Sequence, residues 1–317
     1  MPAVNVIMPA YNVEPFIGAA IASVLGQSMP DLELIIVDDG ATDGSHAAAL
    51  RAAGGDPRVR IIRQHNRGLS AARNTALRHA SAPLIALLDS DDLWAPSYLE
   101  KQLALLEADP TLDVVTGNAW NLGGPNDGEP ARPCPDLRLQ PDLTGILADE
   151  ESIFVMSVFR RRVYETIGGF DETFATNEDY DFWLRAAIAG FRFARNDEPL
   201  GYYRRREDSL SASDIRMLRG ILKVYAKQRP ALVSSHPAVD ILDLQIKRFE
   251  AELLAAEARH AMEIRDFTSA KVHIDALRKR RGGPILSVAQ IMARWTPRLL
   301  WRAYQLRRNR HSAQSQA

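Results

Sequence analysis

The chain has 317 residues, of which 46% are hydrophobic and 25% are charged, a composition typical of soluble globular proteins. No stretch approaches the roughly 20 apolar residues that a membrane-spanning helix needs, and the first residues lack the basic flank and apolar core of a signal peptide. The single cysteine, Cys134, excludes an intramolecular disulfide and fits a reducing compartment. We therefore expect a cytoplasmic protein, with peripheral contact at the inner face of the cell membrane left open.

The net charge of −1 conceals a strongly basic C-terminal tail. No acidic residue follows Asp275, whereas ten lysines and arginines do, so the preceding part of the chain carries a charge of −11. Such an asymmetry predicts that the tail meets an anionic partner. Because the rest of the chain is acidic, we do not expect that partner to be nucleic acid.

Strand-like and helix-like segments alternate along the first part of the chain. Short apolar runs predict strands, and apolar residues spaced by three or four predict helices. The alternation predicts βαβ units and a mostly parallel sheet flanked by helices. The predicted strands are residues 4–11, 32–39, 59–64, 83–89 and 112–120, and the predicted helices are residues 15–25, 46–53, 69–80 and 96–108.

The second part of the chain begins with a proline- and glycine-rich segment, residues 121–144, which predicts a long loop. After it, the pattern predicts a strand at 154–161, a helical turn at 163–167, a helix at 179–189 and short strands at 191–195 and 199–205. From about residue 214 the apolar spacing is helical, and one stretch resembles a single tetratricopeptide unit, which cannot bury its own face. The predicted domains are an α/β domain over 1–213 and a helical region over 214–317.

The most informative motif is LLDSDDLW, in which an apolar run ends in Asp89, Asp91 and Asp92. In a parallel sheet, ligands bind at the C-terminal ends of the strands. Crowded carboxylates repel one another unless a cation neutralises them, and magnesium-type ions take one or two carboxylates plus phosphate oxygens. The motif therefore predicts a metal–diphosphate site, with an acidic helix N-cap as the alternative.

Two further polar segments follow predicted strands. Asp38 and Asp39 end the second strand, where a carboxylate can accept hydrogen bonds from a nucleobase or a ribose, or cap the next helix. Arg67, Gly68 and Arg73 surround a predicted helix start, whose exposed amides favour anions. Arg73 can reach a phosphate or one of the aspartates, or it can form a solvent-exposed salt bridge.

Four segments, MPAYN, VDDGATDGS, NRGLSAARN and LLDSDDLW, occur in the order and at about the spacing seen in family 2 glycosyltransferases of the GT-A fold. The chain resembles that family over roughly residues 3–212. The resemblance implies that Asp39 contacts the nucleobase and that Asp89 and Asp91 form a DxD motif for the ribose and a divalent metal, Mg²⁺ or Mn²⁺. The nucleotide-sugar site that it implies comprises Pro9, Tyr11, Asp39, Arg73, Asp89, Ser90 and Arg206, and the metal site comprises Asp89 and Asp91.

Two later segments also match the family. GGFDETF resembles the glycine-rich loop beside donor and acceptor, and NEDYDFWLR resembles the ED motif. This match implies that Asp179 is the catalytic base, with Glu178 beside it. An inverting transfer needs a carboxylate that takes the proton of the attacking hydroxyl. The alternatives are a negative first turn of a helix and Asp181 as the base.

The segment YYRRREDSLS resembles the closing segment of the family, but Arg206 stands where many relatives carry histidine. Arg206 can hold a diphosphate through a bidentate contact, or the segment can serve a different donor. The QxxRW motif of processive relatives is absent from the sequence, which favours transfer of a single sugar.

Apolar residues of the tail fall near helical spacing between arginines, and its aromatic residues suit a membrane interface. This pattern predicts a basic amphipathic helix on an anionic membrane, or a helix docked on the first domain. The residues concerned are Val288, Ile291, Met292, Trp295, Leu299, Trp301, Tyr304 and Leu306. The helical region is also a plausible surface for a homo-oligomer.

The sequence thus predicts an inverting, metal-dependent glycosyltransferase that moves one sugar from a nucleoside diphosphate sugar to a hydroxyl. UDP is the default nucleotide, and the acceptor is a glycan or a lipid-linked glycan, with cell-envelope polysaccharide synthesis implied by the resemblance. One alternative, a nucleotidyltransferase, is disfavoured because MPAYNVEPF contains no glycine, arginine or lysine. Another is a non-catalytic nucleotide-sugar-binding scaffold. A nicotinamide-binding fold is disfavoured because no GxGxxG follows the first strand.

Overall fold

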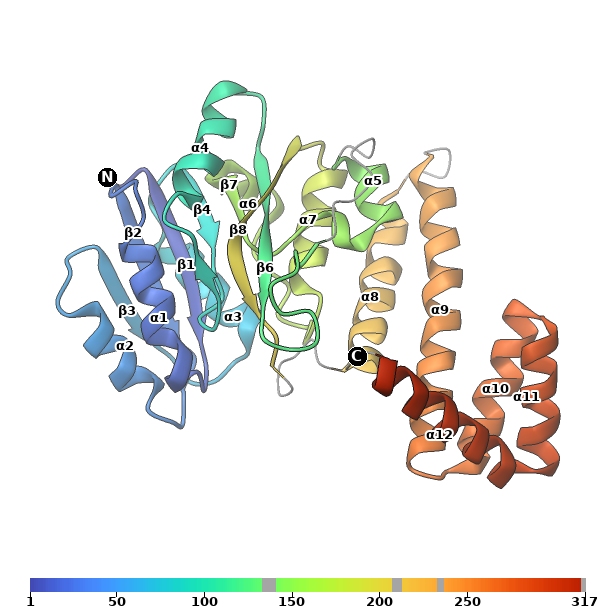
Figure 1. Ribbon diagram of the computed structural model, residues 1–317. Helices are drawn as coiled ribbons and strands as arrows, with labels where there is room; N and C mark the ends of the chain where they lie inside the picture. The colour runs from blue at the N-terminus through green and yellow to red at the C-terminus, as the bar shows by residue number, and fades with distance from the viewer. Residues whose placement is uncertain (133–140, 207–212, 233–236, 315–317) are drawn as a thin grey trace. The chain divides into compact units, whose positions relative to one another are not determined.

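The computed structural model describes residues 1–132, 141–206, 213–232 and 237–314 (Figure 1). The chain forms two compact units, one made of Met1–Ser209 and Lys227–Ile241 and the other of Leu210–Ala226 and Leu242–Ala317. Helix α8, Asp214–Gln228, therefore belongs mainly to the second unit and ends in the first. The boundary at residue 213 stays a prediction about independently folding domains. Cys134 lies outside the described residues.

Within the described residues, the first unit contains an eight-stranded sheet in the order β3-β2-β1-β4-β7-β6-β8-β5. The pairs β3–β2, β2–β1, β1–β4 and β6–β8 are parallel, whereas β4–β7, β7–β6 and β8–β5 are antiparallel. The sheet is thus mixed, with parallel pairing where the first motifs lie. Its strands are β1 (Val4–Ala10), β2 (Leu32–Asp38), β3 (Val59–Arg63), β4 (Leu84–Leu87), β5 (Leu93–Trp94), β6 (Val114–Leu122), β7 (Ser157–Arg160) and β8 (Phe193–Arg204).

Helices flank this sheet (Figure 1). The alanine-rich helix α3 packs closely on β1 and β2, because Ala71, Ala72 and Ala76 are buried and small. Gly68, with φ 90°, provides the turn into this helix. The helices of the first unit are α1 (Glu14–Leu25), α2 (Ser45–Ala53), α3 (Leu69–His79), α4 (Tyr98–Ala108), α5 (Leu143–Ala148), α6 (Arg161–Ile167) and α7 (Glu178–Ile188).

Three features differ from the sequence-based expectation. The two short strands predicted at 191–195 and 199–205 are one strand, β8, whose register with β6 shifts around Asn118. Strand β5 is a two-residue strand that was not predicted. The predicted loop 121–144 begins inside β6 and ends in α5, and its residues 133–140 lie outside the described part.

The second unit is helical, as predicted. Asp266 caps α10 by accepting a hydrogen bond from the Ser269 N–H, and α12 begins at Pro297. Buried apolar residues such as Ala258, Ile274 and Ala293 form part of its core. Its further helices are α9 (Ala238–Glu263), α10 (Phe267–Arg281), α11 (Pro284–Trp295) and α12 (Pro297–Gln314). Among the described residues, no helix combines the length and apolarity that crossing a membrane requires.

Candidate functional site

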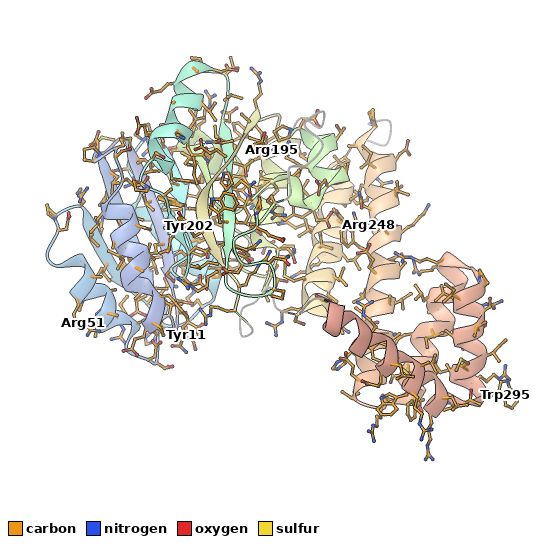
Figure 2. The ribbon with its side chains drawn as sticks, in the orientation of Figure 1. Tyr11, Arg51, Arg195, Tyr202, Arg248 and Trp295 are labelled. Atoms are coloured by element: carbon orange, nitrogen blue, oxygen red, sulfur yellow. The ribbon has the colours of Figure 1, made fainter. Side chains whose placement is uncertain are left out.

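The candidate site lies where β1, β2 and β4 end. Asp39 follows β2 and donates its backbone N–H to the Ala10 carbonyl at the end of β1. The DSDD segment, residues 89–92, follows β4 after one residue, Leu88. Figure 2 labels Tyr11, which is 45% exposed just beyond β1, and Tyr202 on β8. Carboxylates, an exposed aromatic ring and strand ends therefore share one edge of the sheet.

Arg73, on α3, is at the centre of the charged part of this site. Its Nη1 donates to Glu178 Oε1 at 2.5 Å, and its Nη2 donates to Asp89 Oδ1 at 2.7 Å. The guanidinium also lies 5.3 Å from the centre of the Phe170 ring. Because the residue is 1% exposed, it is not the solvent-exposed salt bridge that the sequence left open. Arg73 instead connects the end of β4 to the start of α7.

The two acidic residues at the start of α7 have different surroundings. Glu178 is buried, and burial raises its pKa to about 7, opposed by Arg73 and assisted by the charges of Asp179 and Asp89. Asp179 is half-buried, and its Oδ1 accepts the N–H of Tyr180 at 2.8 Å. Among the described residues, no lysine or arginine forms an ion pair with Asp179. Asp179 is thus the more exposed carboxylate of the pair and, among the described residues, is not held by an arginine as Glu178 is.

The DSDD segment has a second arginine, Arg206. Its Nη1 donates to Asp91 Oδ2 at 3.1 Å, while Arg204 donates its backbone N–H to Asp92 Oδ1 at 2.8 Å and its Nε to the Asp91 carbonyl at 2.8 Å. The pairing of β5 with β8 makes these contacts possible, because it places Leu93 opposite Tyr202. The unpredicted strand β5 therefore brings the closing segment to the carboxylates.

The carboxylates of this segment are unfavourably crowded. Burial and the charge of Asp89 raise the pKa of Asp91, and Arg206 lowers it. Burial, Asp91 and Asp89 raise the pKa of Asp92 well above its ordinary value. Asp92 Oδ2 is buried and has no hydrogen-bond partner among the residues that the structure describes. The arginines therefore leave the negative charge of this segment only partly compensated.

These residues fit a divalent metal that is shared with a phosphate ligand. Carboxylate oxygens are the donors that Mg²⁺-type ions prefer, and one or two of them suffice when phosphates complete the coordination. Asp89 and Asp91 supply that number, beside the unpartnered Asp92 oxygen. Within the described part of the chain, no group of three or more histidine, cysteine or acidic side chains is placed to hold a metal without such help.

The carboxylate of Asp39, the predicted nucleobase contact, is hydrogen-bonded to other residues of the protein. Its carboxylate accepts hydrogen bonds from Gln64 Nε2 at 2.7 Å, from the Arg67 N–H at 2.9 Å and from the Gly68 N–H at 2.8 Å. Asp39 therefore holds the turn before α3 at the end of β2. Asp38 in turn accepts the N–H of Ala41 at 2.8 Å and closes the turn after β2.

The glycine-rich loop after α6 is held from two sides. Asn74 donates to the Phe170 carbonyl at 2.8 Å and accepts the Phe170 N–H at 2.8 Å. Arg185 donates to the carbonyls of Ile167 and Gly169, at 2.7 Å each. A Cβ at Gly169 would clash with the Asn74 side chain, so a larger residue there would displace the asparagine that holds Phe170. The loop is thus anchored to α3 and α7, the helices that carry Arg73 and Glu178.

Asp181, the alternative base, is fully buried and holds three donors. It accepts hydrogen bonds from Arg185 Nε at 2.9 Å, from Lys227 Nζ at 2.9 Å and from Gln228 Nε2 at 2.7 Å. Lys227 also bonds Asp171 in the glycine-rich loop at 2.8 Å, and this bond helps to lower the pKa of Asp171 against its partial burial. These contacts disfavour Asp181 as a base and assign it a positioning role beneath the first turn of α7.

Some of the predicted site residues contact one another, and the others lie around these contacts. Arg73 contacts Asp89 and Glu178, and Arg206 contacts Asp91. Of the remaining predicted residues, Pro9 lies near the end of β1, Tyr11, Asp39 and Ser90 lie in the segments that follow strands, and Asp179 lies in the first turn of α7. Four residues of these contacts were not predicted: Asn74, Arg204, Lys227 and Gln228. Asn74 and Arg204 stand in the motifs NRGLSAARN and YYRRREDSLS, whereas Lys227 and Gln228 carry no local signal because their partner is distant along the chain.

The fold is that of known transferases. The mannosyltransferase PcManGT from Pyrobaculum calidifontis, in complex with GDP-Man and Mn²⁺, superimposes with a TM-score of 0.63 at 23% identity, over 96% of this chain and 84% of that chain. This likeness, the mixed sheet flanked by helices and the helical C-terminal region confirm the predicted GT-A fold.

Sequence comparisons identify the family. The uncharacterized glycosyltransferase EpsJ of Bacillus subtilis (strain 168) is 34% identical over 219 residues, which cover 67% of this chain and 63% of EpsJ. The UDP-Glc:alpha-D-GlcNAc-diphosphoundecaprenol beta-1,3-glucosyltransferase WfgD of Escherichia coli is 40% identical over 104 residues, 32% of this chain and 40% of WfgD. The model of glycosyl transferase family group 2 matches residues 151–250, and that of glycosyl transferase family 2 matches residues 5–168. Because the match to the family 2 model covers more than half of this chain, the chain belongs to glycosyl transferase family 2.

Proposed function

We propose that this protein is an inverting glycosyltransferase that moves one sugar from a nucleoside diphosphate sugar to a hydroxyl acceptor. The observation that carries the proposal is the buried Arg73, which holds Asp89 at 2.7 Å and Glu178 at 2.5 Å. It joins the segment proposed to bind the donor to the helix turn proposed to carry the base. A carboxylate on each side of a donor site suits an inverting transfer, which needs a base and no covalent intermediate.

The donor would lie along the strand ends. We assign the nucleobase side to Pro9, Tyr11 and Asp39, and the ribose and diphosphate to the DSD segment with Arg206. UDP is the nucleotide that we propose, supported by the UDP-Glc in the name of WfgD. A divalent metal, Mg²⁺ or Mn²⁺, fits beside Asp89 and Asp91, and PcManGT was solved with Mn²⁺ and GDP-Man. When bound, such a metal offsets the charge that develops on the leaving diphosphate.

We assign the general base to Asp179. As the acceptor oxygen attacks the anomeric carbon, Asp179 takes the hydroxyl proton, and the bond between that carbon and the diphosphate oxygen breaks. Glu178 would not share this task, because its carboxylate binds Arg73. Its role is to hold the arginine that in turn positions Asp89.

The acceptor that we propose is a hydroxyl of a glycan or a lipid-linked glycan, in cell-envelope polysaccharide synthesis. WfgD, by its name, acts on a sugar carried by diphosphoundecaprenol, which is a lipid. The helical second unit is a further candidate surface for a homo-oligomer.

An acceptor of this kind would be reached at a membrane surface, and the tail has the chemistry for one. Ile285, Val288, Ile291 and Trp295 are exposed at helical spacing along α11, and Figure 2 shows Trp295 pointing outward. Leu299 continues this exposed apolar face on α12. No acidic residue follows Asp275 to balance the arginines between these side chains. We propose that this surface, the basic apolar face of α11 and α12, binds anionic lipid.

The test of the catalytic proposal is the transfer of sugar by a variant that lacks only the base. We expect Asp179→Asn to bind UDP with Mn²⁺ as the unmodified protein does and to lose about 10²- to 10⁴-fold in turnover. Glu165→Gln, which removes an exposed acid on α6, is the matched control and should keep full turnover. A near-normal rate for Asp179→Asn would exclude it as the base, and a product that retains the anomeric configuration of the donor would exclude inversion.

A further inference from the structure

The two acidic residues of the DSD segment are each held by an arginine, but the two arginines differ in their freedom to leave. Arg73 is 1% exposed and holds Glu178 as well as Asp89. If the Arg73 guanidinium lost its contact with Asp89, its ion pair with the buried Glu178 would still hold it in place. Arg206 has a side chain that is 18% exposed, and the Asp91 side chain that it contacts is 23% exposed. Asp89 is itself 27% exposed, so the two pairs differ in the arginine: Arg206 is partly exposed, whereas Arg73 is buried.

The backbone around Arg206 is fixed independently of its side chain. The Arg204 N–H is bonded to Asp92, and the Arg205 N–H is bonded to the Leu122 carbonyl at 3.1 Å. The Arg206 guanidinium lies over the Phe16 ring, 4.8 Å from its centre, a contact that holds the cation near the site. A rotation of the side chain would therefore move the guanidinium away from Asp91 without a change in this part of the backbone.

We propose that Arg206 acts as an internal counter-ion, which occupies the cation position at Asp91 in the ligand-free protein and yields it to the divalent metal of the donor complex. This inference rests on the proposed function. The displaced guanidinium becomes available to the diphosphate, for which its planar donors are suited. Arg73 stays paired with Asp89 in both states. Asp91 alone exchanges its arginine for the metal.

The physical reason is the crowding of Asp89, Asp91 and Asp92. Without any cation at Asp91, three carboxylates would repel one another in a largely buried segment, and Arg206 reduces this repulsion. A divalent ion at the same carboxylate reduces it further and repels the guanidinium that lies 3.1 Å from Asp91 Oδ2. Metal alone must therefore compete with Arg206, whereas metal with diphosphate gives Arg206 a new partner. The metal and the nucleotide should thus strengthen each other's binding.

The experiment is a titration with Mn²⁺, followed by the electron paramagnetic resonance signal of the free ion, without nucleotide and with saturating UDP. Arg206→Gln removes the competing charge, so we expect it to bind Mn²⁺ alone about two- to fivefold more tightly than the unmodified protein, the range of a partly exposed ion pair. With UDP present we expect the order to reverse, because the variant lacks the diphosphate contact.

The matched control is Arg205→Gln. It removes the same charge one residue away, but Arg205 Nε donates to Asn121 Oδ1 rather than to a carboxylate of the site. We expect its affinity for Mn²⁺ alone to stay unchanged. Arg206→Lys, which keeps the charge, should lie between the unmodified protein and Arg206→Gln. Circular dichroism would verify that each variant is folded.

Two results would overturn the inference. One is an Arg206→Gln variant whose affinity for Mn²⁺ alone is unchanged or weaker, and the other is an equal gain in Arg205→Gln, which would mean a general effect of net charge. If the unmodified protein binds UDP with Mn²⁺ and either result is found, the exchange fails while the proposed function stands. If the unmodified protein binds neither Mn²⁺ nor UDP, both proposals fail.

Discussion

The candidate site and the C-terminal tail use arginine in opposite ways. In the site, Arg73 and Arg206 lie against carboxylates that partly neutralise them. In α11 and α12, Arg294, Arg298 and Arg302 form no ion pair with any described residue and lie among exposed apolar side chains. Because the arginines and carboxylates of the site partly neutralise one another, the site suits a ligand that carries both charges, such as a metal cation with a diphosphate. An uncompensated surface needs an anion from outside.

Among substitutions that test this comparison, replacement of Arg73 should have the largest effect on stability and on donor binding. Arg73→Met leaves Asp89 and the buried Glu178 without their shared cation, so we expect a loss of about 3–5 kcal/mol in the free energy of unfolding, together with loss of donor binding. Urea denaturation measures the first effect. Arg67→Met is the control, because its ion pair with Glu172 is exposed and should contribute less than about 1 kcal/mol. Equal effects of the two variants would show that the Arg73 contacts are not special.

Lys227 tests whether the compensation extends beneath the site. Lys227→Met leaves the buried Asp181 with one cation fewer and frees Asp171 in the glycine-rich loop, so we expect a loss of about 1–3 kcal/mol and a lower kcat/KM. Lys101→Met breaks an exposed pair with Glu198 and serves as the control. A variant as stable and active as the unmodified protein would remove Lys227 from the positioning network. A chain that ends at residue 213 would lack this lysine.

The pH dependence of stability tests the environment of Glu178. Burial raises the pKa of Glu178 in the folded protein to about 7. At a pH between its ordinary pKa and 7, the folded protein therefore holds a proton on Glu178 that the unfolded chain releases. The resulting stability is complete at low pH and is lost as the pH rises through 7. In metal-free buffer, the unfolding free energy of the unmodified protein should therefore fall by about 1–3 kcal/mol relative to Glu178→Gln between pH 5 and 8. A difference that grows in the opposite direction would mean that Arg73 outweighs burial.

The tail should show the smallest effects per residue. Replacement of Arg294, Arg298 or Arg302 by glutamine should weaken binding to phosphatidylserine vesicles by about fivefold each, measured by cosedimentation. Arg219→Gln is the control, because Arg219 is paired with Glu257 and should not contribute. Equal binding to neutral phosphatidylcholine vesicles would rule out an electrostatic contribution, and absence of binding to either would favour a protein contact for this face.

The sequence predicted most elements of the fold because the hydrophobic period is clear in each. It missed β5, since two residues are too few to show a period, and it divided β8, since the polar residues Asn196, Asp197 and Glu198 interrupt the apolar pattern. It missed the start of α5 in a segment rich in proline and glycine, although Asp142 caps that helix through the Gly145 N–H. Local signals therefore fail where a strand is very short or contains residues that usually end one.

The site shows the same limit more strongly. The carboxylates at residues 89–92 and 178–179 could be identified from the sequence, because each motif is contiguous. The burial of Arg73 could not, since it depends on Glu178, 105 residues away. The contact of Arg206 with Asp91 depends on the pairing of β5 with β8, which was not predicted. Identities of charged groups can be read from a sequence, but their partners require the fold.

The central claim is that the edge formed by Asp89, Asp91 and Arg206 binds a metal–nucleoside diphosphate complex. Calorimetric titration of the purified protein with UDP, dTDP and GDP, each with Mn²⁺ and each with a chelator, tests it most directly. We expect one nucleotide, UDP by our proposal, to bind with Mn²⁺ and to bind much more weakly with chelator, and Asp91→Ala to lose this difference. Binding of none of the three, or equal binding with and without metal, would contradict the account.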